Sequence, residues 1–150
     1  MKKVLFVCTG NTCRSPMAEF IFKGKLKTAG VKNIKVSSAG LSASDGEKMS
    51  ENALAVLKEN KVRTYAFTSK PVTLELLTAQ NLVIAVTARH KAAMRGFQSV
   101  YTLSELTGCG DVLDPYGGNM DDYRATYKQL DKALDALLAV LTDKENQQGE

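Results

Sequence analysis

A chain of 150 residues has the length of one domain, and a core of that size buries roughly 70% of the surface that the unfolded chain exposes. Hydrophobic residues make up 44% of the chain and charged residues 24%, which excludes disorder, collagen-like structure and a coiled coil as the main state. The formal net charge of +4 permits an anionic ligand but falls short of a nucleic-acid footprint, so we expect no nucleic-acid partner.

The N-terminal segment predicts a buried strand over residues 3–7. Its start, MKKVLFVC, superficially resembles a signal peptide, but the apolar stretch is too short and the polar GNTCRS follows it. The longest apolar runs, such as 4–8 and 82–86, span about five residues, against the ~20 that a membrane helix needs. We therefore expect a cytoplasmic protein with no membrane partner.

Beyond this strand, helical and extended patterns alternate along the chain. The loop 8–15 leads into a helix that Pro16 opens and that continues to Gly30. Further strands are predicted at 34–38, 81–86 and 99–102, further helices at 50–60, 71–79, 89–95 and 120–141, and a Gly/Asp/Pro loop at 107–119. Ser69 is available to cap the helix at 71–79, and residues 142–150 are expected to form a polar, frayed tail.

This alternation predicts the α/β fold class, with three α/β/α layers around a short parallel sheet of about four strands. The almost uniformly apolar segment 81–86 is typical of a central parallel strand covered on both faces. With no repeat, linker or second domain visible, residues 1–150 are expected to form a single domain. Because ligands bind beyond the carboxyl ends of the strands in such sheets, the loop 8–15 lies at the expected site.

The cysteine content argues against a structural role for sulfur. Cys8, Cys13 and Cys109 are too few and too oddly numbered for a disulfide scaffold. Since the sequence has one histidine and no Cys-x-x-Cys pair, a structural zinc site is equally unexpected. We predict no metal and no cofactor.

The segment CTGNTCRSP, residues 8–16, has the features of an anion site. A compact loop between a strand and a helix can turn its backbone N–H groups toward one point, in front of the positive end of the helix dipole. Arg14 follows Cys8 by six residues, so its guanidinium can lie beside the sulfur and contact two phosphate oxygens at once. Helix N-termini and cations favour a thiolate, so we expect Cys8 to be ionised at neutral pH and to attack phosphorus, forming a cysteinyl phosphate. The alternative is an ordinary buried cysteine at a strand end.

A thiolate nucleophile needs a proton donor for the leaving group, and the segment GDVLDPYGG, residues 110–118, is the best source. Asp114 stands in a loop braced by Pro115 and glycines, and a neighbouring phosphate dianion would keep its carboxyl protonated. An ordinary Asp-Pro turn is the alternative. Asp111 and Asp121 are better explained as solvated loop or helix-cap residues.

Three motifs in this order resemble the low-molecular-weight protein tyrosine phosphatase family: VCTGNTCRSPMAE near the N-terminus, SSAG at 37–40 and VLDPYGG at 112–118. The resemblance covers residues 2–141. It implies that Cys8 is the nucleophile, that Arg14 binds phosphate, and that Asp114 is the general acid and then the general base for hydrolysis.

The resemblance also assigns supporting roles within and around the loop. It implies that the phosphate-binding loop consists of Thr9, Gly10, Asn11, Thr12, Cys13, Arg14 and Ser15. Asn11 would hold the strained loop shape, Ser15 would donate a hydrogen bond to the Cys8 thiolate, and Ser38 would support Asn11. Cys13 would form a reversible disulfide with Cys8 under oxidation, although from the residues alone it could be a small packed side chain.

Histidine placement is the one departure from the family pattern. Members often carry a His after the second helix to complete the loop's support, but residues 62–70 contain none. The only histidine, His90, follows a predicted strand, and we expect it at the surface or at a helix start rather than in catalysis.

Thr12 indicates which phosphorylated residue the protein accepts as substrate. Tyrosine-directed members usually carry an apolar residue there, and the loop is more similar to the bacterial protein arginine phosphatase branch. An apolar side chain packs on a phenyl ring, whereas Thr12 can hydrogen-bond a guanidinium, and Asp114 could also accept from it. Tyr116 would wall the cleft for either group. We expect a monomer acting on phosphorylated proteins, with phosphoarginine favoured and phosphotyrosine as the alternative.

Two other functions use a similar loop. A thioredoxin-coupled arsenate reductase needs further redox cysteines, but residues 86–96 contain none and Cys109 has no partner nearby in the sequence. A non-catalytic phosphate-binding or redox-sensing module would not need Asp114.

Overall fold

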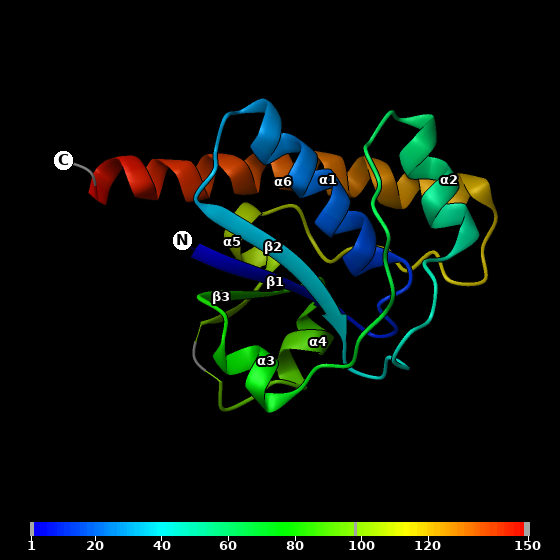
Figure 1. Cartoon of the computed structure of the whole chain (residues 1–150), viewed down its shortest axis with the longest axis horizontal. Coiled ribbons are helices and arrows are strands. Elements are labelled where there is room, and N and C mark those ends of the chain that lie inside the picture. The colour runs from blue at the N-terminus through cyan, green and yellow to red at the C-terminus, as the bar shows by residue number, and fades with distance from the viewer. Residues whose placement is uncertain (1, 98, 149–150) are drawn as a thin grey trace.

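The computed structural model describes residues 2–97 and 99–148, arranged around one parallel sheet (Figure 1). The strands are β1 (Lys2–Cys8), β2 (Ile34–Gly40), β3 (Leu82–Ala85) and β4 (Val100–Thr102), in the spatial order β2-β1-β3-β4. The helices are α1 (Arg14–Thr28), α2 (Glu51–Glu59), α3 (Leu74–Thr78), α4 (Ala88–Ala92), α5 (Leu103–Thr107) and α6 (Met120–Gln148). All three strand pairs are parallel.

Side chains of β1 alternate between the two faces of the sheet, and each face has its own apolar cluster. Val4 and Phe6 pack with residues of α1, α2 and α6, whereas Leu5 and Val7 pack with Leu77 of α3. Figure 1 shows α1, α2 and α6 on one side of the sheet and α3 and α4 on the other. The predicted three-layer α/β/α fold with four parallel strands is therefore confirmed.

Two short helices differ from the prediction. Thr73, not Ser69, caps α3, because Pro71 still lies beside β2 in a bridge with Gly40 and delays the helix. α5 was not predicted, since five residues are too few to show a helical period. Its one sequence signal is the capping box formed by Thr102 and Glu105.

The last helix, α6, extends beyond its predicted end near residue 141 to Gln148. Residues 142–148 contain Lys, Glu and Gln but no Gly or Pro, and such a stretch favours helix even where it adds little to the apolar face. The structure thus assigns residues 142–148 to the helix, residues 149–150 lie outside the described part, and the fraying of this tail stays a prediction. No helix of the described residues is long and apolar enough to span a bilayer.

Leu134 tests the packing of α6 on the sheet. Its side chain is fully buried in the cluster that contains Val4 and Phe6. We expect Leu134→Ala to lower the free energy of unfolding by about 2–5 kcal/mol, because the substitution removes buried methyl groups and leaves a cavity. Urea denaturation measures this, with exposed Lys132→Ala as a control expected to change stability by less than about 0.5 kcal/mol. Equal stabilities of the two variants would contradict the burial of this helix face.

Candidate active site

The loop between β1 and α1 turns sharply at Asn11, which has a positive φ of 55°. Asparagine tolerates this left-handed region better than most residues. Its buried amide donates from Nδ2 to Ser15 Oγ at 2.8 Å and to Ser38 Oγ at 3.0 Å. Its Oδ1 accepts from the backbone N of Lys70 at 3.0 Å. One side chain thus fixes the shape of the loop through contacts with three other residues, at the start of α1, in β2 and at Lys70.

A buried carboxylate, which the sequence analysis missed, continues this network. Ser38 Oγ donates to Glu19 Oε1 at 2.7 Å, and Glu19 Oε2 pairs with Lys23 Nζ at 2.7 Å. Glu19 is only 8% exposed. The sequence signal for this role is the position of Glu19 four residues after Ser15, which places both residues on the same face of the predicted helix. The missing histidine of residues 62–70 leaves this support intact, because the Lys70 amide contacts Asn11 from that segment.

Gly40, the last residue of the SSAG motif, lets β2 approach the loop closely. A Cβ on this residue would lie 2.6 Å from the Thr9 carbonyl oxygen and 2.9 Å from Asn11 N. Both distances are shorter than real Cβ contacts allow. A glycine is needed here because the loop backbone occupies the space of a side chain.

Cys8 ends β1 with its sulfur among hydrogen-bond partners. Sγ lies 2.8 Å from Ser15 Oγ and accepts from Asn11 N at 3.3 Å. α1 starts six residues later, at Arg14, and its N-cap residue, Cys13, makes no side-chain capping bond. The positive end of the α1 dipole therefore points at the loop, where it favours negative charge.

Arg14 connects the loop to the segment that follows α5. Its buried guanidinium donates from Nη1 to the Val112 carbonyl at 3.2 Å. Nη2 lies 3.5 Å from Asp114 Oδ2. The two residues that the sequence singled out 100 positions apart are thus in contact through their charged groups.

The backbone around Asp114 holds the carboxylate toward Arg14. Oδ1 accepts from the backbone N of Tyr116 at 3.1 Å, which leaves Oδ2 on the Arg14 side. From α6, Thr126 Oγ1 donates to the Leu113 carbonyl and Gln129 Oε1 accepts from the Leu113 amide. The helix anchors the loop one residue before the carboxylate.

The other two aspartates considered in the sequence lie outside this arrangement. Asp111 Oδ1 accepts from the first backbone N of α4, Ala88, at 3.1 Å, beside the N-cap residue Thr87. Asp121 lies in the first turn of α6 and pairs with Arg124.

These residues surround a cavity of about 310 Å³ at the carboxyl edge of the sheet. Six lining residues come from the loop: Cys8, Thr9, Gly10, Thr12, Cys13 and Arg14. The other three are Asp114, Tyr116 and Glu47. Asn11, Ser15 and Ser38 stand behind the lining and hold it. Glu47 was not predicted, because it lies in a stretch without regular secondary structure.

Buried Cys13 contacts α6. Its Sγ lies 3.4 Å from the hydroxyl of Tyr123, which accepts from Ser50 Oγ at 3.1 Å. Burial and the neighbouring Cys13 raise the pKa of Tyr123 above its ordinary value, so the phenol stays protonated. Cys8, Cys13 and Cys109 are all free thiols in the structure.

His90 lies at the start of α4, as expected, but it is only 4% exposed, so the alternative of a surface position is wrong. The reason is that α4 packs against β3 and turns this side chain toward the loop. Nε2 lies 2.8 Å from Thr9 Oγ1, and Nδ1 lies 2.9 Å from Thr87 Oγ1.

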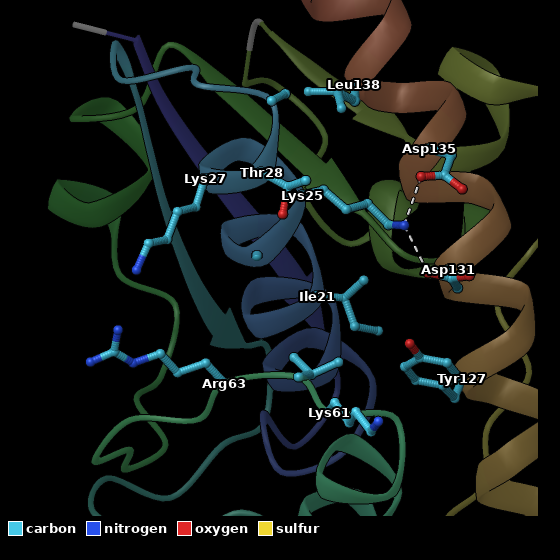
Figure 2. A pocket seen from close by; sticks show the side chains of 13 residues that line it. Ile21, Lys25, Lys27, Thr28, Lys61, Arg63, Tyr127, Asp131, Asp135 and Leu138 are labelled. Carbon is cyan, nitrogen blue, oxygen red and sulfur yellow. Dashed lines mark hydrogen bonds and ion pairs between the residues drawn. The ribbon is translucent and has the colours of Figure 1, made fainter.

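A larger hollow of about 570 Å³ lies between α1 and α6 and is a poor candidate for catalysis (Figure 2). Figure 2 shows Lys25 reaching from α1 to Asp131 and Asp135 of α6, each at 2.7 Å. Although burial alone would lower it, these two hydrogen bonds raise the pKa of Lys25. The charge of Lys25 is thus neutralised by two carboxylates of α6. Across the described residues, no group of three or more His, Cys, Asp or Glu could hold a metal ion.

Comparison with known proteins identifies what the whole chain is similar to. The family model described as low molecular weight phosphotyrosine protein phosphatase matches residues 3–148. A protein-arginine-phosphatase of Bacillus subtilis is 43% identical over 87% of this chain and 91% of its own length. The low molecular weight protein-tyrosine-phosphatase PtpB of Staphylococcus haemolyticus is 36% identical over 85% and 91%. The crystal structure of a YwlE mutant from Bacillus subtilis matches with a TM-score of 0.88 and 41% identity, covering 95% of this chain and 99% of that one.

Proposed function

Since the chain belongs to the low molecular weight phosphotyrosine protein phosphatase family, and is a cysteine-dependent phosphoprotein phosphatase, we propose that Cys8 is its nucleophile, Arg14 its phosphate ligand and Asp114 its general acid. The observation that carries this assignment is the shared cavity. It joins the Cys8 sulfur, the buried Arg14 guanidinium and the Asp114 carboxylate at the N-terminal end of α1.

In the first step, the Cys8 thiolate attacks phosphorus while the bond from phosphorus to the leaving group breaks. The backbone N–H of Asn11, whose nitrogen lies 3.3 Å from Cys8 Sγ, and the α1 dipole stabilise the negative charge that the sulfur carries before attack. Arg14 binds two oxygens of the transferred phosphoryl group through its planar fork. The product of this step is a cysteinyl phosphate.

Asp114 supplies the proton that the leaving group needs. When a phosphoryl dianion occupies the Arg14 side of the cavity, it repels a charged carboxylate and favours the protonated form of Asp114. After the leaving group takes that proton, the Asp114 carboxylate accepts a proton from water, which attacks phosphorus and releases inorganic phosphate from Cys8.

We propose phosphoarginine as the preferred substrate residue, because the rim of the cavity offers acceptors for N–H groups. The Thr12 hydroxyl and the carboxylates of Glu47 and Asp114 all line it. A phosphoarginine guanidinium carries N–H donors beside phosphorus, whereas a phenyl ring has none to satisfy these groups. Tyr116, which is 81% exposed, can stack on a flat guanidinium.

Paired peptides that differ only in phosphoarginine or phosphotyrosine test this preference. We expect the protein to have the higher kcat/KM on phosphoarginine. Thr12→Ile and Glu47→Gln should each reduce the ratio of kcat/KM on phosphoarginine to kcat/KM on phosphotyrosine by about tenfold, because the first removes a hydrogen bond to a charged guanidinium and the second removes the charge of the acceptor.

The matched control is Glu51→Gln, which removes an exposed carboxylate of α2 outside the cavity lining and should leave the ratio unchanged. A preference for phosphotyrosine in the unaltered protein, or equal ratios in all variants, would contradict the proposed selectivity. Neither result would affect the roles of Cys8 and Arg14.

The thioredoxin-coupled alternative finds less support. Cys109 is not among the residues that line the cavity, and its Sγ lies 3.7 Å from the Thr107 carbonyl. The described residues therefore do not assemble a third sulfur with Cys8 and Cys13. Free thiols fit a reducing compartment, so we propose that the protein acts on phosphorylated proteins in the cytoplasm. We also propose that it acts as a monomer.

A further inference from the structure

His90 of α4 joins the phosphate-binding loop to Thr87, which lies between β3 and α4. Nε2 lies 2.8 Å from Thr9 Oγ1, in the residue that follows Cys8. On the other side of the ring, Nδ1 lies 2.9 Å from Oγ1 of Thr87, the N-cap of α4. Both ring nitrogens of a buried imidazole are thus committed to hydroxyl groups, one of which lines the cavity.

The contacts of Thr87 favour one direction for these hydrogen bonds. Thr87 Oγ1 already accepts the backbone N–H of His90 at 3.3 Å, as helix caps do. Its own hydrogen can then be donated to Nδ1. With Nδ1 as acceptor, a neutral ring carries its hydrogen on Nε2 and donates it to Thr9 Oγ1. The hydroxyl hydrogen of Thr9 is left to point elsewhere, and Thr9 lines the cavity.

We propose that His90 is a positioning residue that turns the hydroxyl of Thr9 toward the bound phosphoryl group, so that Thr9 adds a hydrogen bond to those of the loop amides and Arg14. This role rests on the proposed phosphatase site. It concerns a side chain outside the cavity lining, and acts on substrate only through Thr9.

The charges around the ring support the neutral form that this arrangement requires. Burial, and next the positive charge of Arg14, lower the pKa of His90 to about 4. The negative charge of Asp114 opposes this with the next largest effect on the pKa, followed by Arg89, which lowers it, and Asp111, which raises it. At neutral pH the ring therefore has one donor and one acceptor nitrogen.

Because the sequence contains one histidine, the nitrogen NMR spectrum of the ¹⁵N-histidine-labelled protein contains ring resonances of His90 alone, and these need no further assignment. We expect a neutral ring between pH 6 and 8 with its hydrogen on Nε2. In Thr9→Val the Nε2 resonance should shift, because its acceptor is gone. A hydrogen on Nδ1, or an Nε2 resonance that does not shift in Thr9→Val, would overturn the proposal.

A binding experiment then tests the effect on the anion. Inorganic phosphate serves as the probe, and its inhibition constant is measured against p-nitrophenyl phosphate. His90→Asn and Thr9→Val should each raise this constant about tenfold, as expected for one lost hydrogen bond to a charged group. Their combination should also raise it about tenfold rather than a hundredfold, because both changes remove the same interaction.

His90→Gln separates positioning from a general packing role. Its amide nitrogen reaches the place of Nε2 and can donate to Thr9, whereas the shorter Asn amide mimics Nδ1. We expect His90→Gln to recover most of the phosphate affinity that His90→Asn loses, and exposed Arg95→Gln, near the end of α4, to bind phosphate normally. Equal losses in the Gln and Asn variants, or additive losses in the double variant, would overturn the role of His90. The phosphatase mechanism would stand as long as turnover still required Cys8 and Asp114.

Discussion

Cys8→Ser will abolish hydrolysis of phosphopeptides and of p-nitrophenyl phosphate while inorganic phosphate still binds. A serine hydroxyl stays un-ionised where a thiol becomes a thiolate, so the nucleophile is lost. The loop amides, the α1 dipole and Arg14 do not depend on the sulfur, so the anion site persists. We expect turnover to fall by at least about 10⁴-fold, as for other catalytic nucleophiles.

The control for this change is Cys109→Ser, because Cys109 is a free thiol that does not line the cavity. It should retain the turnover of the unaltered protein. Steady-state hydrolysis measures turnover, and calorimetric titration with phosphate measures binding. If Cys8→Ser keeps more than a tenth of the activity, another group is the nucleophile.

Asp114→Asn will slow turnover by about 10²–10⁴-fold without preventing phosphate binding. The amide has the size of the carboxyl and can still accept the Tyr116 N–H at Oδ1, so the turn is kept. It has no acidic proton to give the leaving group. The loss should be larger for phenyl phosphate than for p-nitrophenyl phosphate, since nitrophenolate leaves without protonation more readily.

Asp121→Asn is the control for Asp114, since both are exposed aspartates but Asp121 pairs with Arg124 at the start of α6. It should leave both substrates unaffected. A similar loss of activity on the two substrates in Asp114→Asn would argue that Asp114 orients the phosphoryl group and that another residue supplies the proton.

Local chemistry explains what could be predicted of the site. A Gly-containing loop between an apolar strand and a Pro-opened helix is recognisable from adjacent residues, so the positions of Cys8 and Arg14 at the carboxyl end of β1 could be predicted. The loop around Asp114 was equally recognisable as a turn. The reach of its carboxylate to within 3.5 Å of Arg14 depends on α6, which lies beyond it in the chain.

Two further supporting residues, Glu19 and His90, could not be predicted, for a different reason. Both are polar residues in helices, and hydropathy patterns do not distinguish a buried, hydrogen-bonded polar group from an exposed one. His90 was placed correctly at a helix start, but its burial depends on the packing of α4 against β3. Its partner, Thr9, lies 81 residues away.

By itself, the sequence determined the three-layer α/β/α fold and the identity of the phosphate-binding loop, because hydrophobic periods of strands and helices and the geometry of a strand–loop–helix turn are set by near neighbours. The tertiary structure decided which distant side chains complete the site: Asp114 facing Arg14, Glu19 behind Ser38, and Glu47 and His90 beside the loop. Parallel strands bring their carboxyl ends to one edge of the sheet whatever their separation in the chain. Contacts at that edge therefore depend on strand order, which no local pattern contains.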